Sequence, residues 1–258
     1  MTEGNHKYIK IMSFNIRNGG EGDGANSISR RHPVILTMLE REKPDIIGFQ
    51  EINSMERRWI RASLGTEYVL VGGGRDADYR GEGCSVAFRS DILELSDMET
   101  LWLSDTPKIS GSRFKDAGQS DCPRLLHSLT LKHKEATEPI TVINTHLDHI
   151  GHAARIKELS QIYKYMKDHA KNGVLMGDFN IEPHAAELVE FRESSEAIGW
   201  QDVTADLEGT FHEYGRCMSK IDYIYTDLEC ADTYRVTDKV NGVYCSDHYP
   251  VCAVVRLP

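Results

Sequence analysis

Long hydrophobic runs and an excess of basic side chains are both missing from this 258-residue chain. No apolar stretch approaches the ~20 residues that cross a bilayer. Residues 1–7 (MTEGNHK) lack the apolar segment of a signal peptide, so we expect a cytoplasmic protein without a membrane span. The formal charge of −10 predicts no preference for duplex DNA, because proteins that bind duplexes usually carry a basic face.

The six cysteines, at positions 84, 122, 217, 230, 245 and 252, include no Cys-x-x-Cys pair. This excludes a zinc knuckle and a thioredoxin-type motif. An unexported chain of this size does not need disulfides, so we expect reduced cysteines that lie mostly in the core. The glycines at positions 72, 73 and 74 are not followed by Lys-Ser/Thr at P-loop spacing, and we interpret them as a flexible turn.

Linkers, repeats and low-complexity segments are also absent, and 40% of the residues are hydrophobic. This predicts one domain over residues 1–258 with a large core, and a monomer is favoured. Apolar alternation or short apolar runs predict strands at 9–16, 45–50, 68–71, 84–88, 125–131, 140–146, 174–178, 221–225 and 251–255. Helical spacing predicts helices at 31–42, 53–64 and 153–169. Two sheets with outer helices fit this order better than a doubly wound sheet.

Polar residues stand at the ends of several predicted strands, where a core strand has no reason to carry them. Asn144 and His146 are two residues apart, and so are Asp178 and Asn180. Residues two apart in a strand share a face, so we expect both pairs to point into one cleft.

Further polar residues interrupt or follow the other strands. Asn15 and Glu51 come directly after apolar runs, and Asp222 needs a partner if it is buried. Asp247 and His248 are adjacent, so we place them in a loop where both side chains can converge. Any one of these motifs is more typical of a turn or a cap. Together they provide hard oxygen ligands suited to Mg²⁺ or Mn²⁺ and imidazoles suited to handling protons or charge.

The same residues carry a resemblance. The chain resembles the endonuclease/exonuclease/phosphatase superfamily, which includes deoxyribonuclease I, and within it a subgroup similar to deadenylase catalytic domains. The resemblance spans residues 9–256 and implies an α/β (α+β) fold, a four-layer αββα sandwich with two mixed β-sheets and outer helices. The motifs that carry it are residues 12–15 (MSFN), 48–51 (GFQE), 144–147 (NTHL), 177–180 (GDFN), 221–224 (IDYI) and 246–248 (SDH).

The resemblance implies roles for individual residues. The metal would be held by Asn15 and Glu51, with Asp247 near it. Asp178 would activate the attacking water or protonate the leaving oxygen, and His248, oriented by Asp222, would stabilise the developing charge. The scissile phosphate would be contacted by His146 and Asn180. Several nucleases of the superfamily have an acidic residue where this chain has Arg17, which argues against a second metal ion.

Basic residues outside these motifs are candidates for binding substrate phosphate. Arg75 and Glu82 lie in segments that echo the subgroup, and Arg124 opens a predicted strand. Arg113 lies in the irregular stretch 106–122, where a solvated loop is the alternative interpretation. His146, His149 and His152 could be drawn as a zinc site, but their spacing favours one active-site histidine with solvent-facing neighbours.

These features predict a divalent-metal-dependent phosphohydrolase. A phosphodiesterase acting on single-stranded nucleic acid or nucleotides is the first expectation, and a phosphomonoesterase or a lipid phosphodiesterase is the second. A non-catalytic phosphate-binding module is the alternative of another class, and the complete set of polar residues argues against it. Substrate choice in such folds depends on loops around the cleft, which a single sequence does not resolve.

Overall fold

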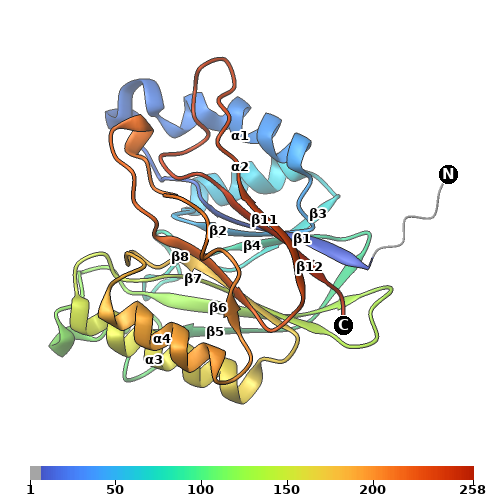
Figure 1. Ribbon diagram of the computed structural model, residues 1–258. Helices are drawn as coiled ribbons and strands as arrows, with labels where there is room; N and C mark the ends of the chain where they lie inside the picture. The colour runs from blue at the N-terminus through green and yellow to red at the C-terminus, as the bar shows by residue number, and fades with distance from the viewer. Residues whose placement is uncertain (1–6) are drawn as a thin grey trace.

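Two six-stranded sheets pack face to face between two layers of helices in the computed structural model, which describes residues 7–258 (Figure 1). The four-layer αββα sandwich expected from the resemblance is thereby confirmed. The expected lack of an export signal rests on residues 1–7, of which 1–6 lie outside the described residues. Within residues 7–258 no helix is long and apolar enough to cross a membrane.

The first sheet contains both ends of the described chain. Its central strands β1 and β2 run parallel, and the other neighbours pair antiparallel. The order is β11 (Cys230–Arg235), β12 (Val251–Arg256), β1 (Tyr8–Asn15), β2 (Ile46–Gln50), β4 (Val86–Arg89) and β3 (Tyr68–Val71).

The second sheet is built in the same way around the parallel pair β7 and β8, with antiparallel neighbours on both sides. Its order is β5 (Leu93–Trp102), β6 (Leu125–His133), β7 (Ile140–His146), β8 (Gly173–Asp178), β10 (Asp222–Thr226) and β9 (Gln201–Asp202). Both sheets are therefore mixed, as expected.

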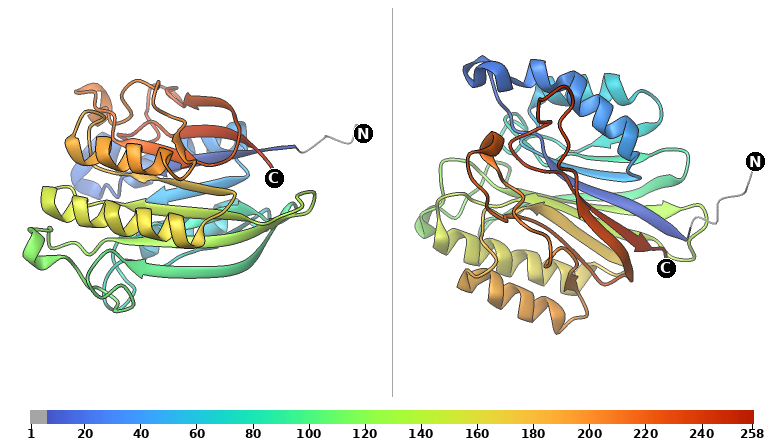
Figure 2. Two further views of the ribbon diagram at one scale, coloured as in Figure 1. Left: turned by 60° about the horizontal axis from the view of Figure 1, so that its bottom comes forward. Right: turned by 45° about the horizontal axis from the view of Figure 1, so that its top comes forward.

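The helices cover the outer faces of the two sheets, as Figure 2 shows. The first sheet is covered by α1 (Ile28–Glu42) and α2 (Ser54–Leu64), and the second by α3 (His152–His169) and α4 (Ala186–Glu196). Helix α1 begins earlier than expected, which places Pro33 beyond its first turn. Helix α2 begins at an Asn53 cap whose side-chain oxygen accepts hydrogen bonds from the backbone of Met55 and Glu56. Short 3-10 turns occur at Glu21–Asn26, Lys115–Ala117 and Glu213–Gly215.

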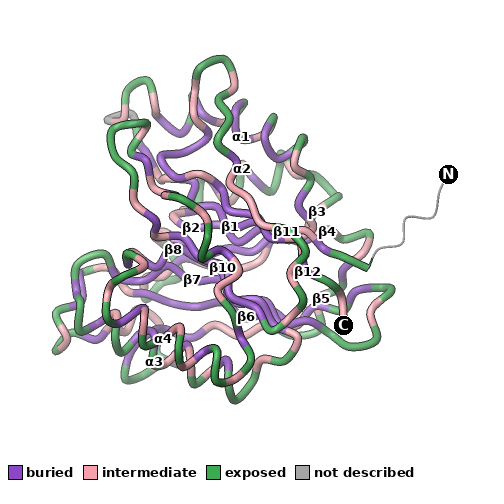
Figure 3. Tube along the Cα trace, viewed as in Figure 1, coloured by how far each residue is buried: buried purple, intermediate pink, exposed green. Residues whose placement is uncertain are grey.

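The buried layer between the sheets consists mainly of branched aliphatic side chains, and Figure 3 shows the central strands as buried. At Gly48 the two sheets come very close. A Cβ atom there would lie 2.7 Å from the Met176 sulfur and 2.8 Å from the Asn144 side-chain oxygen. Glycine at this point of β2 therefore allows the sheet contact that brings the active-site strand ends together.

Four elements were not predicted: strands β5, β9 and β11, and helix α4. All three strands lie at sheet edges. Strand β9 has only two residues, and β5 and β11 carry many exposed polar residues, which hides the alternation expected of a strand. Helix α4 contains two serines near its end, which weakens its helical signal. All six cysteines are free, as expected, but only Cys84, Cys245 and Cys252 are buried.

Candidate active site

The polar strand ends meet at one edge of the sandwich. Asn15 ends β1, while His146 and Asp178 end the parallel strands β7 and β8 in register with each other. Strand β10 runs antiparallel to β8, so its first residue, Asp222, lies opposite Asp178. His248 belongs to the loop before β12, as predicted. The directions of the strands thus bring together, at one edge of the sandwich, residues that lie more than two hundred positions apart in the sequence.

A cleft of about 660 Å³ opens at this edge. Most of the predicted site residues line it: Glu51, Arg75, Glu82, Arg124, His146, Asp178, Asn180, Asp247 and His248. Asn15 and Asp222 lie just behind the lining, with their side chains hydrogen-bonded to Asp178 and His248 respectively.

Asp178 stands at the centre of the cleft's polar contacts. Its Oδ2 accepts a hydrogen bond of 2.9 Å from Nδ2 of Asn15, which also donates to Oε1 of Glu51 at 3.1 Å. Its Oδ1 accepts one of 2.9 Å from the backbone N–H of Asn180. Burial and then the neighbouring Asp222 carboxylate raise the pKa of Asp178 to about 7. A carboxylate with such a pKa can exchange protons near neutral pH.

His248 forms a buried pair with Asp222. Oδ2 of Asp222 lies 2.9 Å from Nδ1 of the imidazole, and Nε2 lies 3.8 Å from Oδ2 of Asp178. Burial lowers the pKa of His248, but Asp222 and Asp178 together raise it more, to about 10. At neutral pH the ring is therefore an imidazolium that presents Nε2–H toward Asp178 and the cleft.

His146 is a neutral imidazole. Burial first, and then the guanidinium groups of Arg124 and Arg75, hold its pKa well below the ordinary value. Its Nε2 accepts a hydrogen bond of 3.0 Å from Nδ2 of Asn180, which also donates to the carbonyl of Leu147. The two histidines of the cleft thus differ in charge. His248 is hydrogen-bonded to the Asp222 carboxylate, whereas burial and two arginines keep His146 neutral although its Nε2 lies 3.5 Å from Oδ2 of Asp178.

The cleft contains oxygen atoms that can serve as ligands of a divalent cation. Nδ1 of His248 is engaged by Asp222 and its ring is protonated, so the compact Asp178–Asp222–His248 group fits proton handling better than metal ligation. Oxygen ligands are available beside it from Glu51 and Asp247. Asn15 directs its amide nitrogen to Glu51 and Asp178, and its Oδ1 accepts a hydrogen bond from the backbone N–H of Arg17, so Asn15 would present its oxygen to a cation only with the amide turned over. Four acidic side chains face only two cations here. The acids are Glu51, Asp178, Asp222 and Asp247, and the cations within ion-pair distance of them are Arg17 and His248. This excess of negative charge favours the binding of a cation.

Comparison with known proteins identifies the fold and the chemistry. The sequence profile of the Endonuclease/Exonuclease/phosphatase family matches residues 12–248. The chain belongs to this family. Its members are metal-dependent hydrolases of phosphate esters, so this protein is a phosphohydrolase that works with a divalent metal.

Several solved structures resemble this phosphohydrolase over nearly the whole of both chains. An endonuclease/exonuclease/phosphatase from Bacteroides vulgatus is 27% identical, with 97% of this chain and 99% of the other covered and a TM-score of 0.87. The mannosyl-6-phosphatase Bt3783 of Bacteroides thetaiotaomicron is 26% identical, with 95% and 98% covered and a TM-score of 0.81. D. rerio TDP2 in complex with a single-stranded DNA product shares the fold at 16% identity, with 96% and 99% covered and a TM-score of 0.74.

A curated relative is matched over a shorter region. It is the "Uncharacterized protein L388" of Acanthamoeba polyphaga mimivirus, 21% identical over 147 residues. The phosphohydrolase spans about half the length of this relative, and the match covers 54% of each chain.

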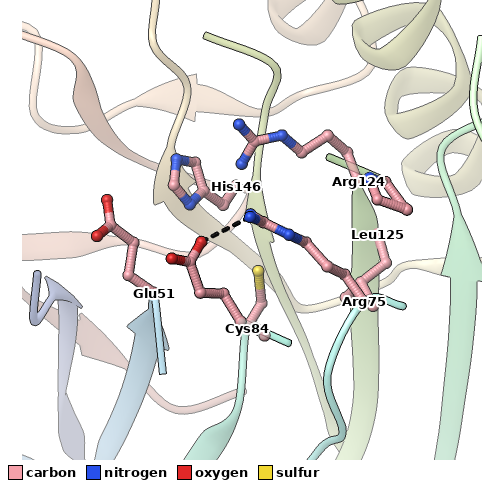
Figure 4. Close-up of a pocket in the computed structure, with 9 residues that line it drawn as sticks. Glu51, Arg75, Cys84, Arg124, Leu125 and His146 are labelled. Atoms are coloured by element: carbon pink, nitrogen blue, oxygen red, sulfur yellow. Dashed lines mark ion pairs between the residues drawn. The ribbon is translucent and has the colours of Figure 1, made fainter. Parts of the chain in front are cut away.

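Two arginines of the phosphohydrolase lie side by side next to His146. Figure 4 shows Arg75 and Arg124 reaching toward His146 from one side, with Glu51 on the other. Arg75 pairs with Oε2 of Glu82 at 2.7 Å. Arg124 is 3% exposed, and only its Nη2 is hydrogen-bonded, at 3.0 Å to Nδ1 of His149. Its Nε and Nη1 are buried without a hydrogen-bond partner within residues 7–258, although Nε lies 3.7 Å from Oδ2 of the buried Asp148, and an unpartnered donor such as Nη1 is costly unless a ligand supplies the acceptor.

Two of the sequence expectations do not hold at the cleft. Asn144 does not face it: the side chain is fully buried, donates to the carbonyls of Phe49 and Cys84, and ties β7 to the first sheet. Arg113 is not brought to the cleft either. It pairs with Asp121 at 2.8 Å within its own loop, which is the solvated-loop interpretation.

Arg31 was not predicted, although it holds the site together. Its guanidinium is fully buried and donates to four backbone carbonyls at 2.6–2.8 Å, those of Ile16, Arg17, Asn26 and Cys245. The first two follow Asn15, and the last precedes the loop of Asp247 and His248. A lone arginine in an amphipathic helix gives no sequence signal for such a role, because its usual place is the surface.

Backbone strain is concentrated around the cleft. Within residues 7–258, nine residues other than glycine have a positive φ, and five of them line the cleft: Arg17, Glu51, Asn180, Glu213 and Tyr214. Such conformations cost free energy and persist where surrounding contacts enforce them, which happens frequently at functional sites.

Proposed function

We propose that this phosphohydrolase cleaves phosphate monoesters of small polar alcohols, such as sugar phosphates or nucleotides, with Mg²⁺ or Mn²⁺ held by Asn15, Glu51 and Asp247. The observation that carries the proposal is the pair of neighbouring guanidinium groups beside His146. Within residues 7–258, Nε and Nη1 of Arg124 are buried without a hydrogen bond, and only Nε has an ion pair, with Asp148 at 3.7 Å. A monoester has a charge near −2 and three terminal oxygens, so it can satisfy more of these donors than a diester can.

The comparisons support the same choice. The neighbour named as a mannosyl-6-phosphatase is 26% identical over almost the whole chain, whereas TDP2 is similar in fold only. A cleft of about 660 Å³ is large enough for a sugar phosphate or a nucleotide. A cytoplasmic location, a monomeric state and the single-domain assignment stay predictions.

The side chains divide the reaction between them. When bound, the divalent cation polarises the phosphoryl group as a Lewis acid. Asp178 takes a proton from the attacking water, for which its pKa of about 7 is suited. His248, fixed by Asp222, donates from Nε2 to the oxygen on which charge develops. Asn180 and His146 contact the phosphoryl group. The P–O bond to water forms as the P–O bond to the alcohol breaks, the leaving alkoxide takes a proton from solvent, and the products are the alcohol and inorganic phosphate.

The second candidate is the phosphodiesterase expected from the sequence, acting on single-stranded nucleic acid or nucleotides. Phe211 and Tyr214, which line the cleft, favour it, because aromatic rings at a cleft wall can stack on bases. The net charge of −10 argues against strong duplex binding, so single strands should be cleaved better than duplexes, with only a shallow dependence on salt.

A hydrolysis screen decides between the two. We would compare p-nitrophenyl phosphate with bis(p-nitrophenyl) phosphate, and sugar phosphates and nucleoside monophosphates with single-stranded and duplex oligonucleotides, inositol phosphates and sphingomyelin. Each assay is run with Mg²⁺, with Mn²⁺ and with chelator, and His248→Ala is the inactive control. We expect monoesters to be hydrolysed at least about 10-fold faster than diesters, with the activity lost on chelation. A preference for diesters supports the second candidate, and no hydrolysis of either class refutes both.

Arg124→Lys tests the observation on which the choice rests. Lysine keeps the charge but has fewer donors and lacks the planar fork, so it cannot satisfy as many phosphate oxygens. We expect KM for the monoester to rise about 10-fold, with a smaller effect on the diester. An equal effect on both substrates would mean that Arg124 does not distinguish monoesters.

A further inference from the structure

A short strained segment forms part of the cleft wall. Glu213 and Tyr214 both have left-handed backbone conformations, with φ values of 43° and 56°, and Gly215 follows with a φ of 91°. Two successive residues with side chains in this region are uncommon. This backbone places the Tyr214 side chain in the lining of the cleft.

The hydroxyl group of Tyr214 has no partner within the described residues, although it is buried. Burial raises its pKa to about 12, so the group keeps its proton and is available as a donor. The charged groups that act on its pKa are Arg31, Asp247, Asp23 and Arg17. A buried hydroxyl without a partner is unfavourable in the free protein, which is the situation expected of a group that awaits a ligand.

The charges around Tyr214 indicate what kind of ligand group it meets. Arg17 is within ion-pair distance of Asp23 and Asp247, at 3.5 and 3.7 Å. Arg31 is saturated by backbone carbonyls. Arg216 pairs with Glu213 at 3.7 Å. Nε of Arg17 has no hydrogen bond, but Asp23 and Asp247 neutralise its charge, and the other two cations on this side are saturated or paired. Nη1 of Arg124, by contrast, has neither a hydrogen bond nor an ion pair within residues 7–258. A neutral polar group therefore fits beside Tyr214 better than a second anion does.

We propose that Tyr214 is a specificity-determining residue that donates a hydrogen bond to an oxygen of the alcohol part of the substrate, and so selects polyhydroxylated phosphate esters. The inference rests on the proposed function. It adds an orientation: the phosphate lies toward Arg75, Arg124 and His146, and the hydroxyl-bearing part lies toward Tyr214. A site built to hydrogen-bond a substrate hydroxyl discriminates against analogues that lack it, because its own polar group then stays unpaired.

Tyr214→Phe tests this with little risk to the fold, because the hydroxyl that it removes has no hydrogen bond to any residue of 7–258. Tyr225→Phe is a matched control. The Tyr225 hydroxyl is also buried without a partner, but its ring packs against Phe179 and Phe191 in the core and does not line the cleft. Both variants should unfold thermally within a few degrees of the wild type.

The measurements compare glucose 6-phosphate, which has hydroxyls on its alcohol part, with p-nitrophenyl phosphate, which has none. We expect Tyr214→Phe to lower kcat/KM for glucose 6-phosphate about 3- to 10-fold, the effect of one neutral hydrogen bond, mainly through KM. The value for p-nitrophenyl phosphate should change less than about 2-fold, and Tyr225→Phe should change neither. Calorimetry of glucose 6-phosphate binding with Ca²⁺ in place of Mg²⁺ gives the affinity independently of turnover.

The outcomes separate this inference from the proposed function. If the wild type binds glucose 6-phosphate without hydrolysing it, the proposed function is wrong. The role of Tyr214 is then tested by comparing the affinities of the wild type and Tyr214→Phe for glucose 6-phosphate. Equal losses on both substrates would overturn the inference, because Tyr214 would then act on the phosphoryl group. Unchanged affinity and kcat/KM in Tyr214→Phe, or no binding of glucose 6-phosphate by the wild type, would overturn it as well.

Discussion

Replacing Asp222 with asparagine tests whether His248 acts as an imidazolium. Asp222 lies 2.9 Å from Nδ1 of the buried ring and, with Asp178, raises the pKa of His248 from an ordinary value of 6.5 to about 10. A shift of this size corresponds to a preference for the charged ring of the order of 5 kcal/mol, since one pKa unit is about 1.4 kcal/mol. Of the carboxylates that favour the charged ring, Asp222 contributes most, followed by Asp178 and Asp247.

Asparagine has nearly the same shape but no charge. Burial, which lowers the pKa of His248, then dominates, and the ring becomes neutral at a much lower pH than in the wild type. Because activity requires the protonated ring, it persists in the wild type until the pH approaches about 10, and in the variant it is lost as the pH rises through the lowered pKa. At pH 8 we expect kcat to fall about 10²- to 10³-fold, as for the loss of one contact to developing charge.

The assay is the pH profile of kcat between pH 6 and 9.5 at saturating substrate and metal, together with an NMR titration of the His248 ring. Asp105→Asn is the matched control, because Asp105 is exposed and its only ion pair is with Lys157 at 3.9 Å. An Asp222→Asn variant that kept its full kcat at pH 8 would refute the electrostatic role. An unchanged pKa of the His248 ring in this variant would refute it as well.

Three further predictions concern metal binding by Glu51, the backbone carbonyls that Arg31 binds, and the buried side chain of Glu158. Glu51→Gln should weaken Mg²⁺ binding and activity together; unchanged calorimetric affinity would remove Glu51 from the metal's ligands. Arg31→Lys should lower the free energy of unfolding in urea by about 3 kcal/mol and weaken metal binding, because an ammonium group cannot reach four carbonyls and the unpaired ones remain buried. Equal stability would contradict this account. Burial raises the pKa of Glu158 to about 8, so the folded protein holds a proton that the unfolded chain releases and stability falls as the pH rises from about 4.5 to 8. Glu158→Gln should therefore have a higher Tm than the wild type at pH 9 but not at pH 4, which calorimetric melts at the two pH values would show.

The sequence alone contained the positions of the central strands and most of the cleft. Strands β7 and β8 are short, mostly apolar runs that end in polar residues. Those polar residues are conspicuous in the sequence because a strand buried in the core is usually apolar throughout. Six such motifs in order were enough to indicate the family and the edge of the sandwich where the site forms. Edge strands β5 and β11 gave no comparable signal, because their exposed faces carry polar residues like those of a loop.

Only the tertiary structure decided which polar residues reach the cleft. Asn144 and His146 share a strand face, yet Asn144 is covered by the first sheet at the point where Gly48 lets the two sheets meet. Arg31 joins its own segment to the carbonyl of Cys245, 214 residues away, and Tyr214 adopts a left-handed backbone. Hydrogen-bond partners and left-handed backbone conformations of this kind depend on packing between segments that are far apart in the chain. Strand periodicity and the polar residues at strand ends depend on neighbouring residues, and these can be read directly from the sequence.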